Sequence, residues 1–277
     1  SHIFLALGML QEVVQANIAA MADVDQVRKA AGKSPAGCGH YASWLGYANL
    51  QLEQKDKARS AVARCHAALA ANAAMDHPGM SMDPDTSLMG GFANMRLRYL
   101  LDTGDWTGEI ASWSLPSTAG AGAGARLDFA FARAVGEVMQ GHRDPARQAL
   151  AELESVGREV AEIKTKSGDP DPSYRVRPEI FLLEVRALLA EQEGDIAGAE
   201  RLILQAVGLE DKLPIAFGPP TIDKPSHELL GEFLLRRGRK DEAHSQFEKA
   251  VARTPGRRLT QQGFEATSAV KVSLTSH

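Results

Sequence analysis

The sequence has no strong excess of charge of either sign, no long hydrophobic run and only two cysteines. Of its 277 residues, 31 are lysine or arginine and 35 are aspartate or glutamate, which gives a net charge of −4. Without a basic excess, nothing favours nucleic acid as a partner. No run of 18 or more residues is apolar, so no membrane span is predicted. What is left is an ordinary folded chain, 44% hydrophobic and 24% charged.

The sequence also lacks the motifs of common active sites. Its eight histidines are scattered, and none has HExxH or Cys/His spacing, so no metal site is predicted. There is no GxSxG element. The GAGAG stretch at 120–124 lacks both the lysine of a phosphate-binding loop and a preceding strand. We therefore expect a protein that is not an enzyme, with no catalytic residues and no cofactor.

The two cysteines, Cys38 and Cys65, allow at most one internal disulfide. If residues 39–68 form a helical hairpin, Cys38 precedes its first helix and Cys65 lies near the end of its second, so the two come close. A disulfide would indicate an oxidising compartment. Two reduced thiols are the alternative, and the one we favour. The compartment, cytoplasmic or periplasmic, stays open, because any targeting signal would lie upstream of residue 1.

The most ordered stretch is His227–Pro255, HELLGEFLLRRGRKDEAHSQFEKAVARTP. Apolar residues recur at helical spacing on both sides of Gly238, which predicts two helices joined by a turn. Gly231 lies inside the first helix at a cost of about 1 kcal/mol relative to alanine. It therefore requires a packing reason, and close approach of a second helix would supply one.

This stretch resembles the tetratricopeptide repeat, with its pattern W-x2-L-G-x2-Y…A-x3-F…P. His227 stands at the tryptophan position and Leu234 at the tyrosine position, whereas Ala243, Phe247 and Pro255 match. Five weaker copies align on their turns. The resemblance implies one all-α domain, a superhelical solenoid of about six hairpins. Their expected ranges are 1–22, 39–68, 90–114, 126–160, 179–209 and 224–255, with turns at Gly8, Glu53, Gly104, Gly141, Gly194 and Gly238 and a capping segment at 257–277.

The connections between these hairpins are long and rich in proline, glycine and aspartate, which is typical of loops. The loop Leu213–Pro225 is unusually apolar and stiff, so we expect it to pack against the helices. We interpret Tyr174–Val176 as loop. The second helix near Glu109–Trp113 is expected to be short, because Pro116 follows it.

The phrases SHIFLALGM, WLGYANLQ and KPSHELLGEFLL are similar to a group of bacterial tetratricopeptide-repeat proteins. That resemblance implies no activity. It does imply an N-terminal portion missing here, often with a secretion signal, so we expect the chain to be a fragment of a longer protein.

In tetratricopeptide arrays the first helices line a concave groove where ligands bind. Asn94 and Arg98 are suggestive of the two-carboxylate clamp of chaperone-binding members, although its full residue set is not matched. Tyr47 and Phe131 are the expected aromatic anchors. Carrying the groove positions over gives the candidate partner-binding residues His40, Tyr47, Asn94, Arg98, Asp128, Phe131, Glu184, Glu228 and Glu232, together with Ser43.

We therefore expect a scaffold that binds a protein or peptide in its concave groove, with no nucleic acid and no membrane span. The groove becomes more acidic toward its C-terminal end, which suits a basic or polar peptide. Three alternatives stay open. One is a small-molecule or sensor module whose loops, above all Leu213–Pro225, cap a pocket. Another is an enzyme completed by a missing N-terminal part, for which His40, Arg98 and Asp128 would have to cluster. The third is self-assembly through the N-terminal half-repeat.

Overall fold

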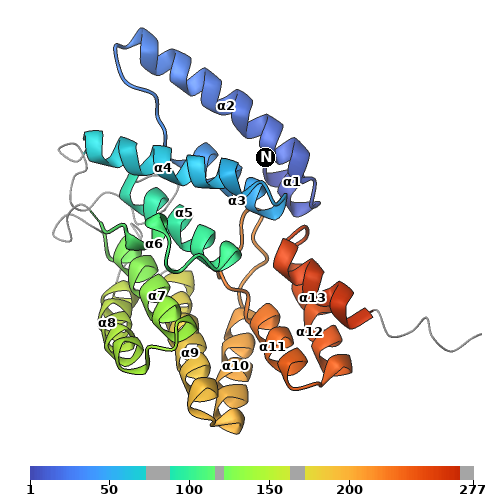
Figure 1. Ribbon diagram of the computed structural model, residues 1–277. Coiled ribbons are helices and arrows are strands. Elements are labelled where there is room, and N and C mark those ends of the chain that lie inside the picture. Colours follow the sequence, from blue (N-terminus) through green and yellow to red (C-terminus); the bar gives the residue numbers. More distant parts are fainter. Residues whose placement is uncertain (73–87, 116–121, 163–171, 269–277) are drawn as a thin grey trace, which may run out of the picture.

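The computed structural model describes residues 1–72, 88–115, 122–162 and 172–268, and all regular structure in these ranges is helical (Figure 1). The all-α class expected from the sequence is therefore confirmed. The helices are α1 (His2–Ala6), α2 (Leu10–Ala30), α3 (His40–Gln51), α4 (Lys55–Asn72), α5 (Leu88–Thr103), α6 (Glu109–Ser112), α7 (Ala123–Met139), α8 (Arg143–Ala161), α9 (Pro172–Glu193), α10 (Ile196–Glu210), α11 (Ser226–Arg236), α12 (Lys240–Arg253) and α13 (Arg258–Ser268).

Consecutive helices pack as hairpins, α1 on α2, α3 on α4, and so on to α11 on α12, with α13 packed on the last pair (Figure 1). The first helices α3, α5, α7 and α9 also pack on one another in order. The hairpins lie close to the ranges expected from the sequence. The largest differences are α2, which continues to Ala30, and α9, which begins earlier than expected.

The six residues expected at the hairpin turns all adopt the left-handed backbone conformation. Five are glycines, which adopt it without steric cost. The sixth is Glu53, with φ of +59°, the one non-glycine residue with positive φ in the described part of the chain. Its backbone N–H donates to the carbonyl of Leu50, and that of Gln54 donates to Asn49, closing the end of α3. The sequence alignment of Glu53 with the glycines is thus confirmed by its conformation.

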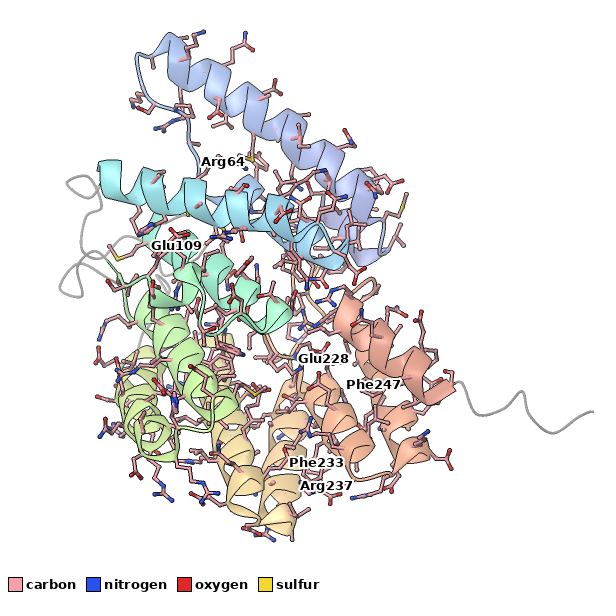
Figure 2. The ribbon with its side chains drawn as sticks, in the orientation of Figure 1. Arg64, Glu109, Glu228, Phe233, Arg237 and Phe247 are labelled. Atoms are coloured by element: carbon pink, nitrogen blue, oxygen red, sulfur yellow. A yellow bond between two sulfur atoms is a disulfide. The ribbon has the colours of Figure 1, made fainter. Side chains whose placement is uncertain are left out.

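The glycine inside α11, Gly231, makes room for an aromatic ring of α12. A Cβ atom at Gly231 would lie 2.9 Å from the ring of Phe247, which is fully buried on α12. The same ring packs on Gly263 of α13. Figure 2 shows Phe247 among the three C-terminal helices. The expected close approach of a second helix to Gly231 is confirmed.

The interpretation of Tyr174–Val176 as loop is wrong, because these residues lie in the first turns of α9. Pro172 starts the helix, where its missing N–H is not needed. Pro178 lies inside the helix and packs toward Gly157 of α8, where an added Cβ would lie 3.3 Å from the proline ring. Packing against this glycine offsets the lost backbone hydrogen bond. The side of the molecule lined by the first helices α3, α5, α7, α9 and α11 is called the inner face below. The early start of α9 matters, because it brings Arg177 to this face.

The two ends of the helical series touch each other. A Cβ atom at Gly256, just before α13, would lie 3.2 Å from Cα of Gly8, at the turn between α1 and α2. The backbone N–H of Arg258 donates to Oε1 of Gln51 at 2.9 Å, and its guanidinium donates to the carbonyl of Asp102 at 2.6 Å. In Figure 1, α13 lies beside the N-terminal hairpin. The inner face is therefore bounded by helices from both ends.

Cys38 and Cys65 form a disulfide, with their Cα atoms 4.4 Å apart. Cys38 lies just before α3 and Cys65 lies in α4, as the hairpin geometry requires. The alternative of two reduced thiols, which the sequence favoured, is wrong. The bond ties the start of the second hairpin to its own second helix.

Replacing Glu53 with glycine should raise the free energy of unfolding by about 1 kcal/mol, because it removes the cost of a side chain at positive φ. The measurement is urea unfolding followed by circular dichroism. Glu53→Ala is the matched control: it removes the same carboxylate and keeps a Cβ atom, so it should give no gain. Equal stabilities of the two variants would contradict the account of this turn.

Replacing both cysteines with alanine should lower the free energy of unfolding by about 3 kcal/mol, because the bond closes a loop with a sequence separation of 27 residues. A reducing agent should lower the melting temperature of the wild type and leave that of the double variant unchanged. Equal melting temperatures of the oxidised and reduced wild type would contradict a structural disulfide.

Candidate binding site on the inner face

The nine candidate residues predicted from the sequence all lie on first helices of the hairpins, α3, α5, α7, α9 and α11. Most are not open to solvent, and they fall into separate groups. Tyr47, Asn94, Asp128, Phe131, Glu184 and Glu228 are buried, whereas His40, Arg98 and Glu232 are partly buried. The chain's own loops and its C-terminal segment contact most of them.

The first group surrounds Asp223, at the end of the loop Leu213–Pro225. Its carboxylate is fully buried and accepts from Nε of Arg98 at 2.8 Å and from Nη2 of Arg177 at 2.6 Å. The side-chain amide of Asn94 donates to it at 3.1 Å. The two positions suggestive of a carboxylate clamp, Asn94 and Arg98, thus do hold a carboxylate, and it belongs to the chain itself.

The loop that carries Asp223 crosses the inner face toward the N-terminal hairpins. Ile222 is buried, and an added Cβ at Gly218 would lie 2.8 Å from the ring of Trp44. Its outer part is different, since Phe217 is 72% exposed. The expected packing of this loop is confirmed for its second half. The cavity beneath it is about 20 Å³, room for about one water molecule and not for a ligand.

Asp128 of α7 joins this group through Arg177, whose Nη2 lies 2.6 Å from its carboxylate. Burial, with the negative charge of Asp223 nearby, raises the pKa of Asp128 to about 6 despite the guanidinium. For Asp223, burial is outweighed by Arg177 and Arg98, which hold its pKa below the usual range. The two carboxylates share one guanidinium, and Asp223 takes the larger part of its stabilisation.

The second group surrounds Glu228 of α11, which Figure 2 shows near the middle of the molecule. Its carboxylate is fully buried and accepts from Nε of Arg257 at 2.7 Å, from Nζ of Lys224 at 2.9 Å and from the hydroxyl of Thr260. Nη2 of Arg257 lies 3.0 Å from Oδ1 of Asp102 on α5. A buried arginine just before α13 therefore joins α11 to α5.

Next to the second group, with Lys224 in its wall, lies an open cavity of about 420 Å³, called the central pocket below. Its walls come from α5, α7, α9 and α11, and Leu259 of α13 and Lys224 complete it. Most of the lining is apolar, and charged side chains stand among it. The residues that define the pocket are Leu101, Gly104, Trp106, Phe131, Val135, Val138, Met139, Glu184, Leu188, Glu191, Gln192, Lys224, Leu229, Glu232, Arg236 and Leu259.

Glu184 is the buried acid of this pocket, with 1% of its surface exposed. Its Oε1 accepts from the hydroxyl of Ser226 at 3.0 Å, whereas its Oε2 has no hydrogen-bond partner. Burial, with the charge of Glu210 behind it, raises the pKa of Glu184 well above its usual range. A neutral carboxyl group here has a hydrogen-bonding atom that no side chain of the pocket satisfies.

Three of the nine candidate residues, Phe131, Glu184 and Glu232, line the central pocket. His40 lies apart from them, with its ring 4.8 Å from that of Trp44 and 5.7 Å from that of His2. The geometry does bring Arg98 and Asp128 together, through Asp223 and Arg177.

Sequence reasoning missed Asp223, Arg177, Lys224 and Arg257 as members of the inner face. One signal was present in the loop Leu213–Pro225, where the charged residues Asp223 and Lys224 follow an apolar stretch. If this loop packs against the helices, both charges need partners of opposite charge or hydrogen-bond partners. For Arg257 no comparable signal existed, because its two carboxylate partners lie 29 and 155 positions away in the sequence.

Nothing in the described residues forms a group of three or more His, Cys, Asp or Glu side chains suited to a metal ion. Among the described helices, none is long and apolar enough to cross a membrane. The inner face thus offers hydrogen bonds, charges and an apolar pocket.

Glu228→Gln should lower the free energy of unfolding at pH 7 by about 3–5 kcal/mol, because Arg257 loses a buried counter-charge. Burial alone would raise the pKa of Glu228. The positive charges of Arg257 and Lys224 outweigh this effect and hold the pKa at about 2, below the unfolded value of about 4.3. Its contribution is therefore present above pH 4.3 and lost as pH falls toward 2.

The difference from the wild type should accordingly shrink between pH 5 and pH 2, measured by urea unfolding at each pH. Glu232→Gln is the control, since that side chain is 31% exposed and pairs with Lys224 alone. A loss as large in the control, or a pH-independent gap, would contradict this assignment.

Asp128→Asn should show the opposite pH dependence. The folded pKa of about 6 lies above the unfolded value of about 3.9, so ionised Asp128 costs stability as pH rises through this window. Relative to the wild type, the variant should therefore gain about 2 kcal/mol between pH 4 and pH 7.5. Urea unfolding at the two values checks this, and a loss on going to pH 7.5 would refute it.

Comparison with known proteins does not extend this description. No model of a protein family matches the chain. No curated protein and no solved structure matches it either.

Proposed function

We propose that this chain is a non-enzymatic binding module of the tetratricopeptide-repeat type, a helical solenoid that holds a peptide segment of a partner protein in its central pocket. Six consecutive hairpins with equivalent turn residues support the repeat assignment. So do the residues of the last hairpin, where Gly231 receives Phe247.

The observation that carries the proposal is the central pocket itself. It lies among the first helices of four successive hairpins, the surface that such repeats use for ligands. The N-terminal half of the same face is filled by the loop Leu213–Pro225 and held there by Asp223. The pocket is thus the part of the inner face left for a partner.

The lining indicates the chemistry of the segment. Val135, Met139 and Leu188 offer apolar contact to one large side chain. Glu184 lines the pocket, and its Oε2, although buried, has no hydrogen-bond partner. Glu191 and Arg236 pair with each other at 2.8 Å, so the charged side of the pocket is close to neutral. An apolar anchor residue flanked by hydrogen-bonding groups fits this arrangement.

The alternative of a small-molecule module is supported by the pocket's volume of about 420 Å³, which lies within the usual range for such sites. In that case the cap would not be the middle of the loop Leu213–Pro225, since the space beneath it is about 20 Å³. The enzyme alternative would require His40 to act together with Arg98 and Asp128, whereas the ring of His40 packs with those of Trp44 and His2.

The test is selection of a phage-displayed random peptide library against the wild-type chain. We expect peptides that share one large apolar residue, bound with micromolar or tighter affinity. Leu188→Trp fills the pocket and should weaken them at least tenfold, measured by isothermal titration calorimetry. Leu204→Trp makes the same change at an exposed position of α10 and should have no effect.

Peptides that bind both tryptophan variants equally would show that the pocket is not their site. Failure to select any peptide, with a fragment screen giving ligands sensitive to Leu188→Trp, would favour the small-molecule alternative.

A further inference from the structure

A second cavity exists because α6 is so short. It has four residues, whereas the second helices of the hairpins on either side, α4 and α8, have 18 and 19. Among the described residues, parts of α7 and α8 line a cavity at the place that a longer α6 would occupy. The resulting cavity has a volume of about 610 Å³ and is called the α6 pocket below. Its lining includes Arg96, Trp106, Trp113, Phe129, Arg126 and Arg133.

Aromatic rings form its walls. The ring of Trp106 lies against Gly136 of α7, where an added Cβ would lie 3.0 Å from it, so the glycine makes room for the indole. Trp113 stacks on His66 with ring centres 4.3 Å apart. Phe129 is partly buried and lies under the guanidinium of Arg96, at 4.3 Å. Flat apolar faces of this kind suit a planar ring.

Arg96 lines the same pocket, and its charge is buried without a carboxylate partner among the described residues. It is 6% exposed, and its guanidinium donates to the carbonyls of Ile110 at 2.9 Å and Ala111 at 2.6 Å. Its Nη1 donates to no described residue, and no carboxylate of the described chain pairs with it. Burial without a counter-charge lowers the pKa of Arg96 to about 10.

Three other arginines of the inner face have carboxylate partners. Arg98, Arg177 and Arg257 each lie within 3.0 Å of at least one buried carboxylate. A buried cation without a partner is costly, which gives Arg96 a strong attraction for an anion that enters from outside.

The two other arginines of the pocket, Arg126 and Arg133, lie at its rim and do have carboxylate partners. Arg126 pairs with Glu159, and Arg133 lies 3.0 Å from Glu152. Those pairs are partly exposed, so they contribute little to fixing a ligand. The charge that an incoming anion would neutralise is therefore that of Arg96.

We propose that the α6 pocket, which shares the wall residue Trp106 with the central pocket, is a second binding site, for a small planar aromatic molecule that carries a carboxylate. The ring packs among Trp106, Trp113 and Phe129. The carboxylate accepts hydrogen bonds from the free donors of Arg96, as planar guanidinium groups favour.

The experiment compares two probes with the same ring, 1-naphthylacetate and its uncharged amide, by isothermal titration calorimetry on the whole chain at pH 7.5. We expect the acid to bind at least tenfold more tightly than the amide. Arg96→Met should abolish this difference. Arg133→Met removes a cation from the rim and should leave the difference intact.

A filling variant keeps the proposal testable if Arg96→Met disturbs α6, since that arginine also holds two of its carbonyls. Ala132→Phe places a ring in the pocket from α7 and should prevent both probes from binding. Circular dichroism and melting temperature report whether each variant is folded. Leu188→Trp, in the central pocket, should leave naphthylacetate binding unchanged, which separates this site from the proposed peptide site.

Three results would overturn the proposal. One is equal binding of the acid and the amide to the wild type, and another is no binding of either at millimolar concentration. The third is a folded Arg96→Met or Ala132→Phe variant that binds the acid as tightly as the wild type does.

Discussion

The buried guanidinium of Arg257 sets the main constraint on this structure. A charge with 1% of its side chain exposed has to be satisfied within the protein, and its partners are Glu228 of α11 and Asp102 of α5. Because these acids come from opposite parts of the helical series, the C-terminal hairpin has to lie against the N-terminal ones. The contact of Gly256 with Gly8 and the hydrogen bonds of Arg258 follow from that placement.

The inner face is largely occupied by the chain itself. Asp223 provides the carboxylate that Asn94 and Arg98 hold, and Arg177 shares it with Asp128. A surface of first helices is therefore not equivalent to an open groove. The inserted loop covers one side of this face and α13 the other, and none of the nine candidate residues is fully exposed.

Local features of the fold could be predicted because they depend on neighbours in the sequence. The left-handed turn at Glu53, the glycine under Phe247 and the brevity of α6 each follow from residues within one hairpin. The start of α9 was missed because Pro178 reads as a helix breaker, and only the glycine of a neighbouring helix makes it tolerable. The partners of Asp223 and Arg257 were beyond prediction, since helical periodicity shows which side of a helix faces inward and not what it meets there.

The contact between Arg257 and Asp102 also limits how this protein could change its length. In an open array of hairpins a further unit is inserted with little effect on distant ones. Here an extra hairpin between α5 and α11 would carry the two halves of a buried ion pair apart and leave charges without partners. Gain or loss of a repeat should consequently be rare in its descendants, and variation should gather in the connecting loops.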